Sequence, residues 1–225
     1  MTARLEDKGD RLIIWNGNAA RRGALTPELY DVIAQAMTEA AAPRIRSVIF
    51  TSQGDFFCAG GDLNVLIERR TLPEAERREK IDLLHDLVHS MRACPVPIIA
   101  AVEGGAAGAG ASLALACDLI VAARGAKFTA AYVKAGLVPD AGGSWALPNR
   151  VGLARAMGLA LTGDPLDATE AVQWGLIWKS CPDEELMPTA TALAANFANG
   201  PTAAYAGTKS LMRAAPSNSL GAHLD

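Results

Sequence analysis

Hydrophobic and polar positions follow two alternating patterns along the first two thirds of the chain. Short apolar runs rich in β-branched residues predict strands at residues 11–17, 45–52, 96–104 and 118–123. Longer segments with helical spacing predict helices at residues 26–41, 73–93 and 109–117. The later strands are apolar throughout, which is typical of strands covered on both faces. The alternation predicts an α/β fold with a largely parallel sheet flanked by helices.

The pattern changes after Ser144, where helical segments follow one another with few strand signals. These segments cover residues 145–163, 167–176, 183–200 and 201–215. The chain shows no internal repeat and no clear linker. We therefore expect one domain over residues 1–225, with an α/β core at about 1–143 and a helical region at about 144–225.

Composition narrows the choice of partner. Half of the residues are hydrophobic, 21 are glycine and only 5% are aromatic, so many backbone segments must pack closely through small side chains. A formal net charge of −3 argues against a nucleic-acid or anionic-membrane partner. No apolar run approaches the roughly 20 residues of a membrane span, and the first ten residues carry charges where a signal peptide is apolar. We expect a cytoplasmic protein that binds a small molecule.

Several common chemistries find little support in the sequence. There is no phosphate-binding P-loop, and residues 142–146 begin like a G-x-S-x-G nucleophile motif but end in alanine. His85 and His89 have the spacing of a zinc-binding pair, but the helix around them is densely charged and favours a solvated face. The four scattered cysteines lack a C-x-x-C pair and are predicted to be reduced core residues. We expect no metal site.

Two glycine- and alanine-rich turns stand out, at residues 56–64 and 103–117. Each follows a predicted strand and leads into a predicted helix. Small residues let a ligand approach the backbone, and a helix start leaves its N–H groups unpaired. One N–H from each turn could hold an oxygen that gains negative charge, as in an oxyanion hole. Spacing alone leaves open that both turns are only tight strand-to-helix connections.

Three ordered motifs in these regions resemble one known family. They are FCAGGDL in the first turn, AAVEGGAAGAGASLALACD in the second, and GLVPDAGGS further on, supported by RRGALT at residues 21–26 and A-x-x-WGLI at 171–177. From about Leu12 to the end, the chain resembles the enoyl-CoA hydratase/isomerase, or crotonase, superfamily. The resemblance implies a crotonase-like spiral of ββα units with a helical C-terminal region, and assembly as homotrimers or dimers of trimers. It also implies acyl-CoA substrates, with coenzyme A as part of the substrate and no separate cofactor, and a further helix beyond the position of Leu224.

The same resemblance implies roles for individual residues. The oxyanion hole falls on the backbone N–H groups of Gly61 and Ala109. The path of coenzyme A and its pantetheine arm falls on Arg22, Ala24, Ala59, Asp62 and Leu63. Walls of the acyl pocket fall on Leu66, Ile67, Tyr132, Val133, Leu137 and Trp145.

The sequence departs from the hydratase pattern at two positions. Hydratases of this family use two glutamates, which match Ser112 and Tyr132 here. Neither serine nor an ordinary tyrosine readily replaces a carboxylate in activating water, so hydration is disfavoured. A carboxylate instead occurs at Asp140, in a segment that resembles 1,2-epoxyphenylacetyl-CoA isomerases and related enoyl-CoA isomerases. One acid can move a proton between two carbons, and an apolar setting would raise its pKa toward neutrality.

The resemblance therefore favours an isomerase with Asp140 as proton shuttle, acting in fatty-acid or phenylacetate catabolism. Other readings stay open. Asp140 could cap the helix that begins near Ser144, or attack carbon as in 4-chlorobenzoyl-CoA dehalogenase, although no matching aromatic and histidine arrangement is evident in the sequence. The chain could also be a hydratase with atypical acids, or a non-catalytic member that binds acyl-CoA or RNA.

Overall fold

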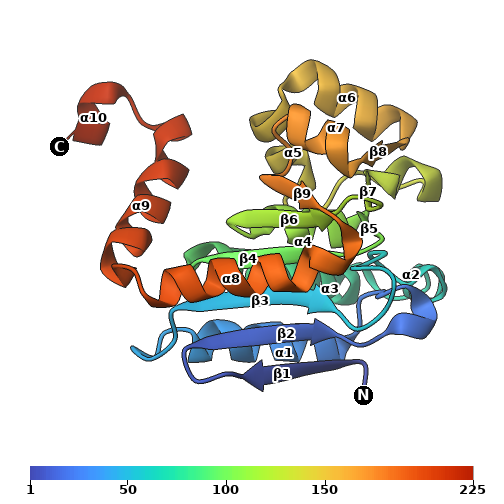
Figure 1. Ribbon diagram of the computed structural model, residues 1–225. Helices are drawn as coiled ribbons and strands as arrows, with labels where there is room; N and C mark the ends of the chain where they lie inside the picture. Colours follow the sequence, from blue (N-terminus) through green and yellow to red (C-terminus); the bar gives the residue numbers. More distant parts are fainter. Residues whose placement is uncertain (225) are drawn as a thin grey trace.

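A six-stranded sheet forms the centre of the structure, a computed structural model that describes residues 1–224 (Figure 1). Its strands lie in the order β1-β2-β3-β4-β6-β9, and each neighbouring pair is parallel except β1 and β2. The strands are β1 (Ala3–Asp7), β2 (Arg11–Asn16), β3 (Ser47–Ser52), β4 (Ile98–Val102), β6 (Leu119–Ala123) and β9 (Lys179–Cys181). The four strands that the sequence predicts are β2, β3, β4 and β6, so the predicted parallel sheet is confirmed.

Helices cover both faces of this sheet. The helices of this part of the chain are η1 (Ala19–Arg21), α1 (Pro27–Glu39), α2 (Leu63–Arg69), α3 (Glu74–Ala93), α4 (Ala109–Ala116) and η2 (Ala131–Ala135), and α8 (Leu186–Ala198) joins them from the C-terminal part. The α8 helix lies across β3 and β4 on one face, while α1 and α3 lie on the other (Figure 1). Every residue of β3 and β4 is buried as a result, which accounts for their continuous apolar sequences.

Local signals explain where α1 begins. Thr26 caps the helix, its hydroxyl oxygen accepting a hydrogen bond from the Leu29 N–H, and Pro27 occupies the first helical position. The α1 side chains that face the sheet include Leu29 and Ile33, both fully buried. The predicted helix at 26–41 is therefore confirmed to within two residues at its end.

A second, three-stranded sheet was not predicted. It consists of β5 (Gly105–Ala107), β7 (Lys127–Thr129) and β8 (Pro165–Asp167), in the order β5-β7-β8. Strands of three residues are too short to show alternation, and the backbone of β5 belongs to the glycine-rich second turn. The edge strand β1 was also missed because Arg4 and Glu6, which form an ion pair there, make it look like a polar terminus.

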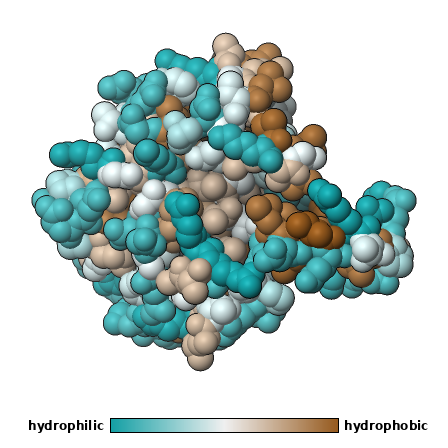
Figure 2. Space-filling view, turned by 90° about the vertical axis from the view of Figure 1, so that its right-hand side faces the viewer, coloured by the Kyte–Doolittle hydropathy of each residue, from teal (hydrophilic) through white to brown (hydrophobic). Residues whose placement is uncertain are grey.

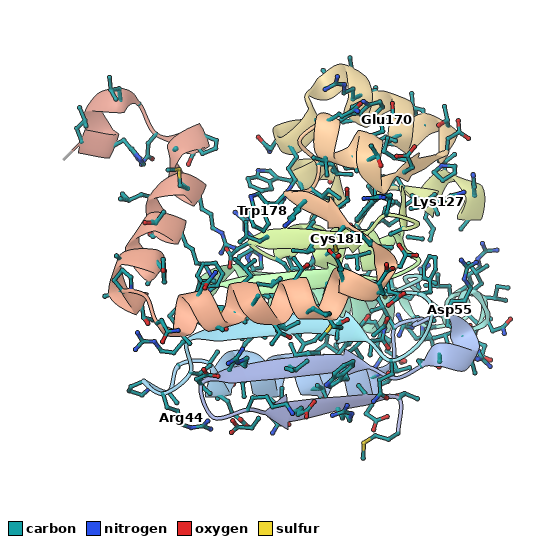
Figure 3. All side chains as sticks on the ribbon, in the orientation of Figure 1. Arg44, Asp55, Lys127, Glu170, Trp178 and Cys181 are labelled. Atoms are coloured by element: carbon teal, nitrogen blue, oxygen red, sulfur yellow. The ribbon has the colours of Figure 1, made fainter. Side chains whose placement is uncertain are left out.

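The C-terminal part contributes strands as well as helices. Its remaining elements are α5 (Gly143–Val151), α6 (Leu153–Thr162), α7 (Ala168–Gln173), η3 (Asp183–Glu185), α9 (Thr202–Ala214), η4 (Ala215–Ser217) and α10 (Leu220–Leu224). The single helix expected at 145–163 is two, because Gly152 adopts a positive φ of 78° between them. The β9 strand extends the main sheet beside β6, with Trp178 before it and the buried Cys181 at its end (Figure 3).

Two simple sequence expectations can be compared with these elements. All four cysteines are buried and unpaired, as predicted. None of the helices within residues 1–224 has both the length and the apolar character that crossing a bilayer requires.

The α9 helix stands away from the rest of the molecule and has no buried residue (Figure 1). Ion pairs help to attach it, because Lys209 and Arg213 both donate to the Asp118 carboxylate at 2.6 Å, and the Tyr205 ring packs against Phe197 of α8. Asp118 also accepts a hydrogen bond from the Ile98 N–H at 2.8 Å, and its side chain is only 13% exposed. A largely buried carboxylate at the end of the sheet therefore anchors this helix.

We predict that Asp118→Asn loosens α9. Removing one partner of a largely buried ion cluster leaves the two cations uncompensated, so we expect a loss of about 2 kcal/mol in unfolding free energy. Thermal unfolding and amide exchange across residues 202–214 measure the effect. Asp7→Asn is the control, since solvent screens the exposed Asp7–Arg44 pair and its loss should change stability little. Equal effects of the two substitutions would contradict the prediction.

Candidate active site

The two glycine-rich turns lie directly against each other. Cys58 in the first turn pairs with Ala106 in the second as a parallel bridge, and the Ala107 N–H donates to the Cys58 carbonyl at 2.9 Å. The first turn is also bonded to the segment before α1, because the Leu25 N–H donates to the Gly60 carbonyl at 2.8 Å. The predicted juxtaposition of the two turns is therefore present.

Glycine is required where the turns meet. Gly60 has a φ of 85°, and a Cβ there would lie 2.8 Å from the Ala107 carbonyl oxygen. A Cβ on Gly110 would lie 2.7 Å from the Cys58 Sγ and still closer to its carbonyl oxygen. The backbones thus touch at a separation that no larger residue allows.

Each turn offers a backbone donor. Within residues 1–224, neither the Gly61 N–H nor the Ala109 N–H donates to another protein group. Ala109 is the first residue of α4, so its N–H carries the partial positive charge of a helix N-terminus. Asp62 follows Gly61 and caps α2 through the Asn64 N–H at 2.9 Å. These two N–H groups can donate to a ligand oxygen without breaking any hydrogen bond of the fold.

Five residues predicted for this site share one pocket of about 520 Å³. They are Ala24, Ala59, Gly61, Asp62 and Leu63. The pocket is also lined by Arg21, Asn64, Ala131, Lys134 and Ala135, which the sequence reasoning missed. Figure 2 looks onto the side of the molecule where α2 lies, and apolar patches interrupt a mostly polar surface there.

Arg21 rather than Arg22 faces this pocket. The Arg21 guanidinium pairs with the Asp62 carboxylate, whereas Arg22 lies 4.1 Å over the Phe56 ring. Arg22 adopts a φ of 51° at the end of η1, which turns the two neighbouring side chains in different directions. The sequence could not separate them, because that turn in the backbone appears only in the folded chain.

Other predicted wall residues lie elsewhere. Trp145 is half exposed, and the Arg92 Cζ lies 4.5 Å from the centroid of its ring. It lines a different pocket, beside α9. Tyr132 is only 6% exposed and points into the interior. Leu137 is 43% exposed and is not among the residues that line the 520 Å³ pocket. Leu66 lies over Gly61, with its Cδ1 3.0 Å from where a Cβ would stand.

Ser112, Tyr132 and Asp140 meet in the interior. The Ser112 and Tyr132 hydroxyl oxygens lie 2.6 Å apart, and both face the backbone carbonyl oxygen of Asp140, at 3.1 and 3.4 Å. The same carbonyl accepts the Gly143 N–H at 2.7 Å. The two positions that matched hydratase acids therefore hold hydroxyl groups that contact the third candidate residue.

The Asp140 carboxyl is partly buried, and its Oδ1 atom has no hydrogen-bond partner within the described part of the chain. Burial raises the pKa of this carboxyl above its ordinary value, and the Tyr132 hydroxyl and His85 oppose the rise. Burial, together with the Asp140 charge, also raises the pKa of Tyr132. Tyr132 therefore stays protonated at neutral pH, whereas Asp140 can exchange a proton closer to neutrality than an ordinary aspartate.

His85 is a neighbour that the sequence reasoning placed on a solvated face. It is half-buried on α3, one turn before Val88, whose Cγ1 lies 3.8 Å from where a Cβ of Gly142 would stand. His89 is exposed. The buried Leu84 and Val88 around His85 were the available signal, but the many charges of α3 obscured it.

We predict that Gly110→Ala disrupts the contact between the two turns. The added methyl group would overlap Cys58, so the unfolding free energy should fall by about 2 to 3 kcal/mol. Chemical denaturation measures this loss. Gly158→Ala in α6 is the matched control, because a Cβ there meets no atom within 4 Å and alanine favours a helix by about 1 kcal/mol. A Gly110 variant as stable as the control would contradict the close contact.

Comparison with known proteins identifies clear relatives. Residues 18–225 match the family model described as "Enoyl-CoA hydratase/isomerase". The chain is 42% identical over 216 residues to a probable enoyl-CoA hydratase of Rhodobacter capsulatus, covering 96% of this chain and 79% of that one. It is 41% identical over 207 residues to the 1,2-epoxyphenylacetyl-CoA isomerase of Escherichia coli, covering 91% and 79%. The crystal structure of an enoyl-CoA hydratase from Polaromonas sp. JS666 aligns with a TM-score of 0.95 and 38% identity, covering 99% and 87%.

Proposed function

Because the chain belongs to the enoyl-CoA hydratase/isomerase family, we propose that it is an acyl-CoA isomerase that shifts a double bond or opens a ring epoxide. The reaction passes through an enolate held by backbone N–H groups, with Asp140 as the proton shuttle. Coenzyme A enters as part of the substrate.

The pocket beside the first turn is the proposed thioester site. Gly61 lines it together with Ala24, Ala59 and Leu63, whose small or apolar side chains suit a pantetheine arm. Arg21 and Lys134 line the same pocket and provide positive charge for the phosphates of coenzyme A. A thioester that enters here brings its carbonyl to the turn that carries the Gly61 N–H.

Two backbone donors would then stabilise the charge that develops on the thioester oxygen. Removing a proton from the carbon next to the carbonyl converts the carbonyl oxygen into an enolate oxygen. Within residues 1–224 the N–H groups of Gly61 and Ala109 have no partner, so both are free to donate to this oxygen. One such donor contributes about 3 to 4 kcal/mol to transition-state stabilisation in well-studied enzymes.

The observation that carries the choice of isomerase is the arrangement of Ser112, Tyr132 and Asp140. Both hydroxyls contact the Asp140 carbonyl, and Tyr132 stays protonated, so neither is a base for activating water. The Asp140 carboxylate beside them has a buried, unpaired oxygen and a raised pKa. It can take a proton from C2 of a 3-enoyl thioester and return it to C4, which moves the double bond to C2=C3. The same proton leaves and returns, so the step needs no other reactant.

Hydration is the second candidate, because the Rhodobacter and Polaromonas relatives carry the name enoyl-CoA hydratase. The name of the Escherichia coli relative supports a ring epoxide as substrate. Assembly as trimers or dimers of trimers, a cytoplasmic location and a role in fatty-acid or phenylacetate catabolism stay predictions, as does a non-catalytic acyl-CoA-binding role as the alternative to an enzyme.

We predict that wild-type protein isomerises enoyl thioesters and that Asp140→Asn lowers turnover at least 100-fold, since the amide cannot accept the proton. A 3-enoyl-CoA, a 2-enoyl-CoA and an aryl-acetyl-CoA epoxide are incubated separately, and products are followed by mass spectrometry and absorbance. Isomerisation changes the spectrum without changing the mass. Asp86→Asn, at an exposed position on α3, is the control and should leave turnover unchanged.

The raised pKa also predicts the pH dependence. Asp140 acts first as a base, so kcat should rise with pH through a pKa above the ordinary aspartate value.

In the product assay, a gain of one water would favour hydration, and free coenzyme A would favour hydrolysis. Full turnover by Asp140→Asn, with coenzyme A ligands still bound, would refute the shuttle.

A second prediction concerns stability. Burial disfavours the charged form of Asp140, so the folded state binds more protons than the unfolded state between the ordinary and the raised pKa. Stability is therefore lost as pH rises through this interval, and the loss persists above it. Asp140→Asn should unfold at higher denaturant than wild type at pH 8, with the difference shrinking toward pH 4. A variant less stable than wild type at pH 8 would contradict this sign.

A further inference from the structure

We propose that Ser112 and Tyr132 are positioning residues, which hold the backbone carbonyl of Asp140 and thereby fix its carboxylate relative to the second turn. This inference rests on the proposed function of Asp140. It assigns a role to the two side chains that stand at the positions of the hydratase acids.

Proton counting gives the two hydroxyls a direction. A carbonyl oxygen only accepts, and the Ser112 hydroxyl makes the shorter of the two contacts to the Asp140 carbonyl, at 3.1 Å against 3.4 Å for Tyr132. We assign the single Ser112 proton to this shorter bond. The 2.6 Å contact between the hydroxyls therefore needs the proton of Tyr132, which donates to the Ser112 oxygen. The result is a chain from Tyr132 through Ser112 to Asp140, with a longer contact of 3.4 Å from Tyr132 to the same carbonyl. The side chains are 6% and 3% exposed, so water does not compete well for these bonds.

The backbone turn that these hydrogen bonds hold is strained. Residues 140–143 form a tight turn closed by the Gly143 N–H and the Asp140 carbonyl, and its two central residues both have positive φ, 47° at Ala141 and 77° at Gly142. Such a turn suits glycine at both positions, yet the first is a buried alanine. The left-handed conformation is unfavourable for a residue with a Cβ. Strain of this kind persists only where the surroundings hold the backbone in place.

The space around the hydroxyls matches this role. A Cβ on Gly143 would lie 2.5 Å from the Ser112 oxygen and 3.4 Å from the Tyr132 oxygen. Glycine at this position therefore leaves room for the two hydroxyls to reach the carbonyl of Asp140. Any larger side chain at position 143 would push the turn away from the two hydroxyl groups.

The hydrogen bonds of Tyr132 and Ser112 also connect Asp140 to both halves of the proposed site. Ser112 lies on α4 three residues after Ala109, so the helix that begins with an oxyanion donor also holds the Asp140 turn. Tyr132 belongs to η2, whose residues Ala131 and Lys134 line the thioester pocket. Three elements are thereby held at a constant separation. A proton shuttle must reach two carbons of one substrate, and displacement by about 1 Å can lower such rates about 100-fold.

The neighbours of Asp140 determine how its titration would respond. His85 on α3 and the Tyr132 hydroxyl oppose the rise in its pKa. Burial raises the pKa of Tyr30 on α1 to about 12, and the Asp140 charge adds to that rise. If the turn relaxes toward solvent, the carboxyl loses the burial that raises its pKa. The acid side of the kcat–pH profile should then move to lower pH.

The test compares Ser112→Ala, Tyr132→Phe and the double variant with Thr51→Val. Thr51 is 2% exposed and donates to the Ala101 carbonyl at 3.1 Å, so the control removes a buried hydroxyl-to-carbonyl bond between two strands of the main sheet. The assays measure kcat, KM and the kcat–pH profile with a 3-enoyl-CoA, and hydrogen exchange over residues 137–146. Asp140→Asn is measured beside them.

We expect Ser112→Ala to lower kcat by about 10- to 100-fold with KM changed less than about threefold, to shift the acid limb downward and to speed exchange in the turn. The double variant should lose little more than Ser112→Ala, because the two hydroxyls act in series. Tyr132→Phe removes only a hydroxyl and should also speed exchange, which keeps the test intact if Ser112→Ala folds poorly. Thr51→Val should lower stability without changing the pH profile.

Two results would overturn the inference: exchange and kcat in Ser112→Ala that match those of Thr51→Val, or losses in the double variant that are the sum of the single ones. Failure of the proposed function looks different. In that case Asp140→Asn keeps wild-type turnover, while the exchange measurements still report whether the hydroxyls hold the turn.

Discussion

The close contact between two glycine-rich turns is the constraint on which the rest of the structure depends. Cys58 and Ala106 can pair only because Gly60 and Gly110 allow the backbones to touch. This contact holds the turn that follows β3 against the turn that follows β4, and within residues 1–224 the N–H groups of Gly61 and Ala109 in these turns have no partner. Small residues in these turns are thus a requirement of packing and also the source of the proposed oxyanion hole.

Stability and proposed catalysis oppose each other at Asp140. An unpaired carboxylate oxygen in the interior and a left-handed alanine beside it both cost folding free energy. Burial also raises the pKa of the carboxyl, and the strained turn fixes its position. The Ser112 hydroxyl and the Gly143 N–H donate to the Asp140 carbonyl, and Tyr132 contacts the Ser112 hydroxyl at 2.6 Å. These contacts hold the turn in its unfavourable local conformation.

Much of the fold could be predicted because its signals are local. The apolar runs of β3 and β4 and the capped, amphipathic α1 are read from a few neighbouring residues. The second sheet and β9 could not, since strands of three residues have no periodicity and depend on a partner distant in the sequence. The C-terminal region was accordingly expected to be helical, although β8 and β9 belong to it.

For the candidate site, the sequence by itself determined the residue types: glycines in two turns, hydroxyls at positions 112 and 132, and a carboxylate at 140. Motifs of contiguous residues were enough for that, and for the family. Only the tertiary structure decided that Arg21 rather than Arg22 faces the pocket, that His85 acts to lower the pKa of Asp140, and that Tyr132 is buried. Side-chain direction at these positions depends on backbone turns and on helices that meet across the molecule, and no local pattern of residues records either.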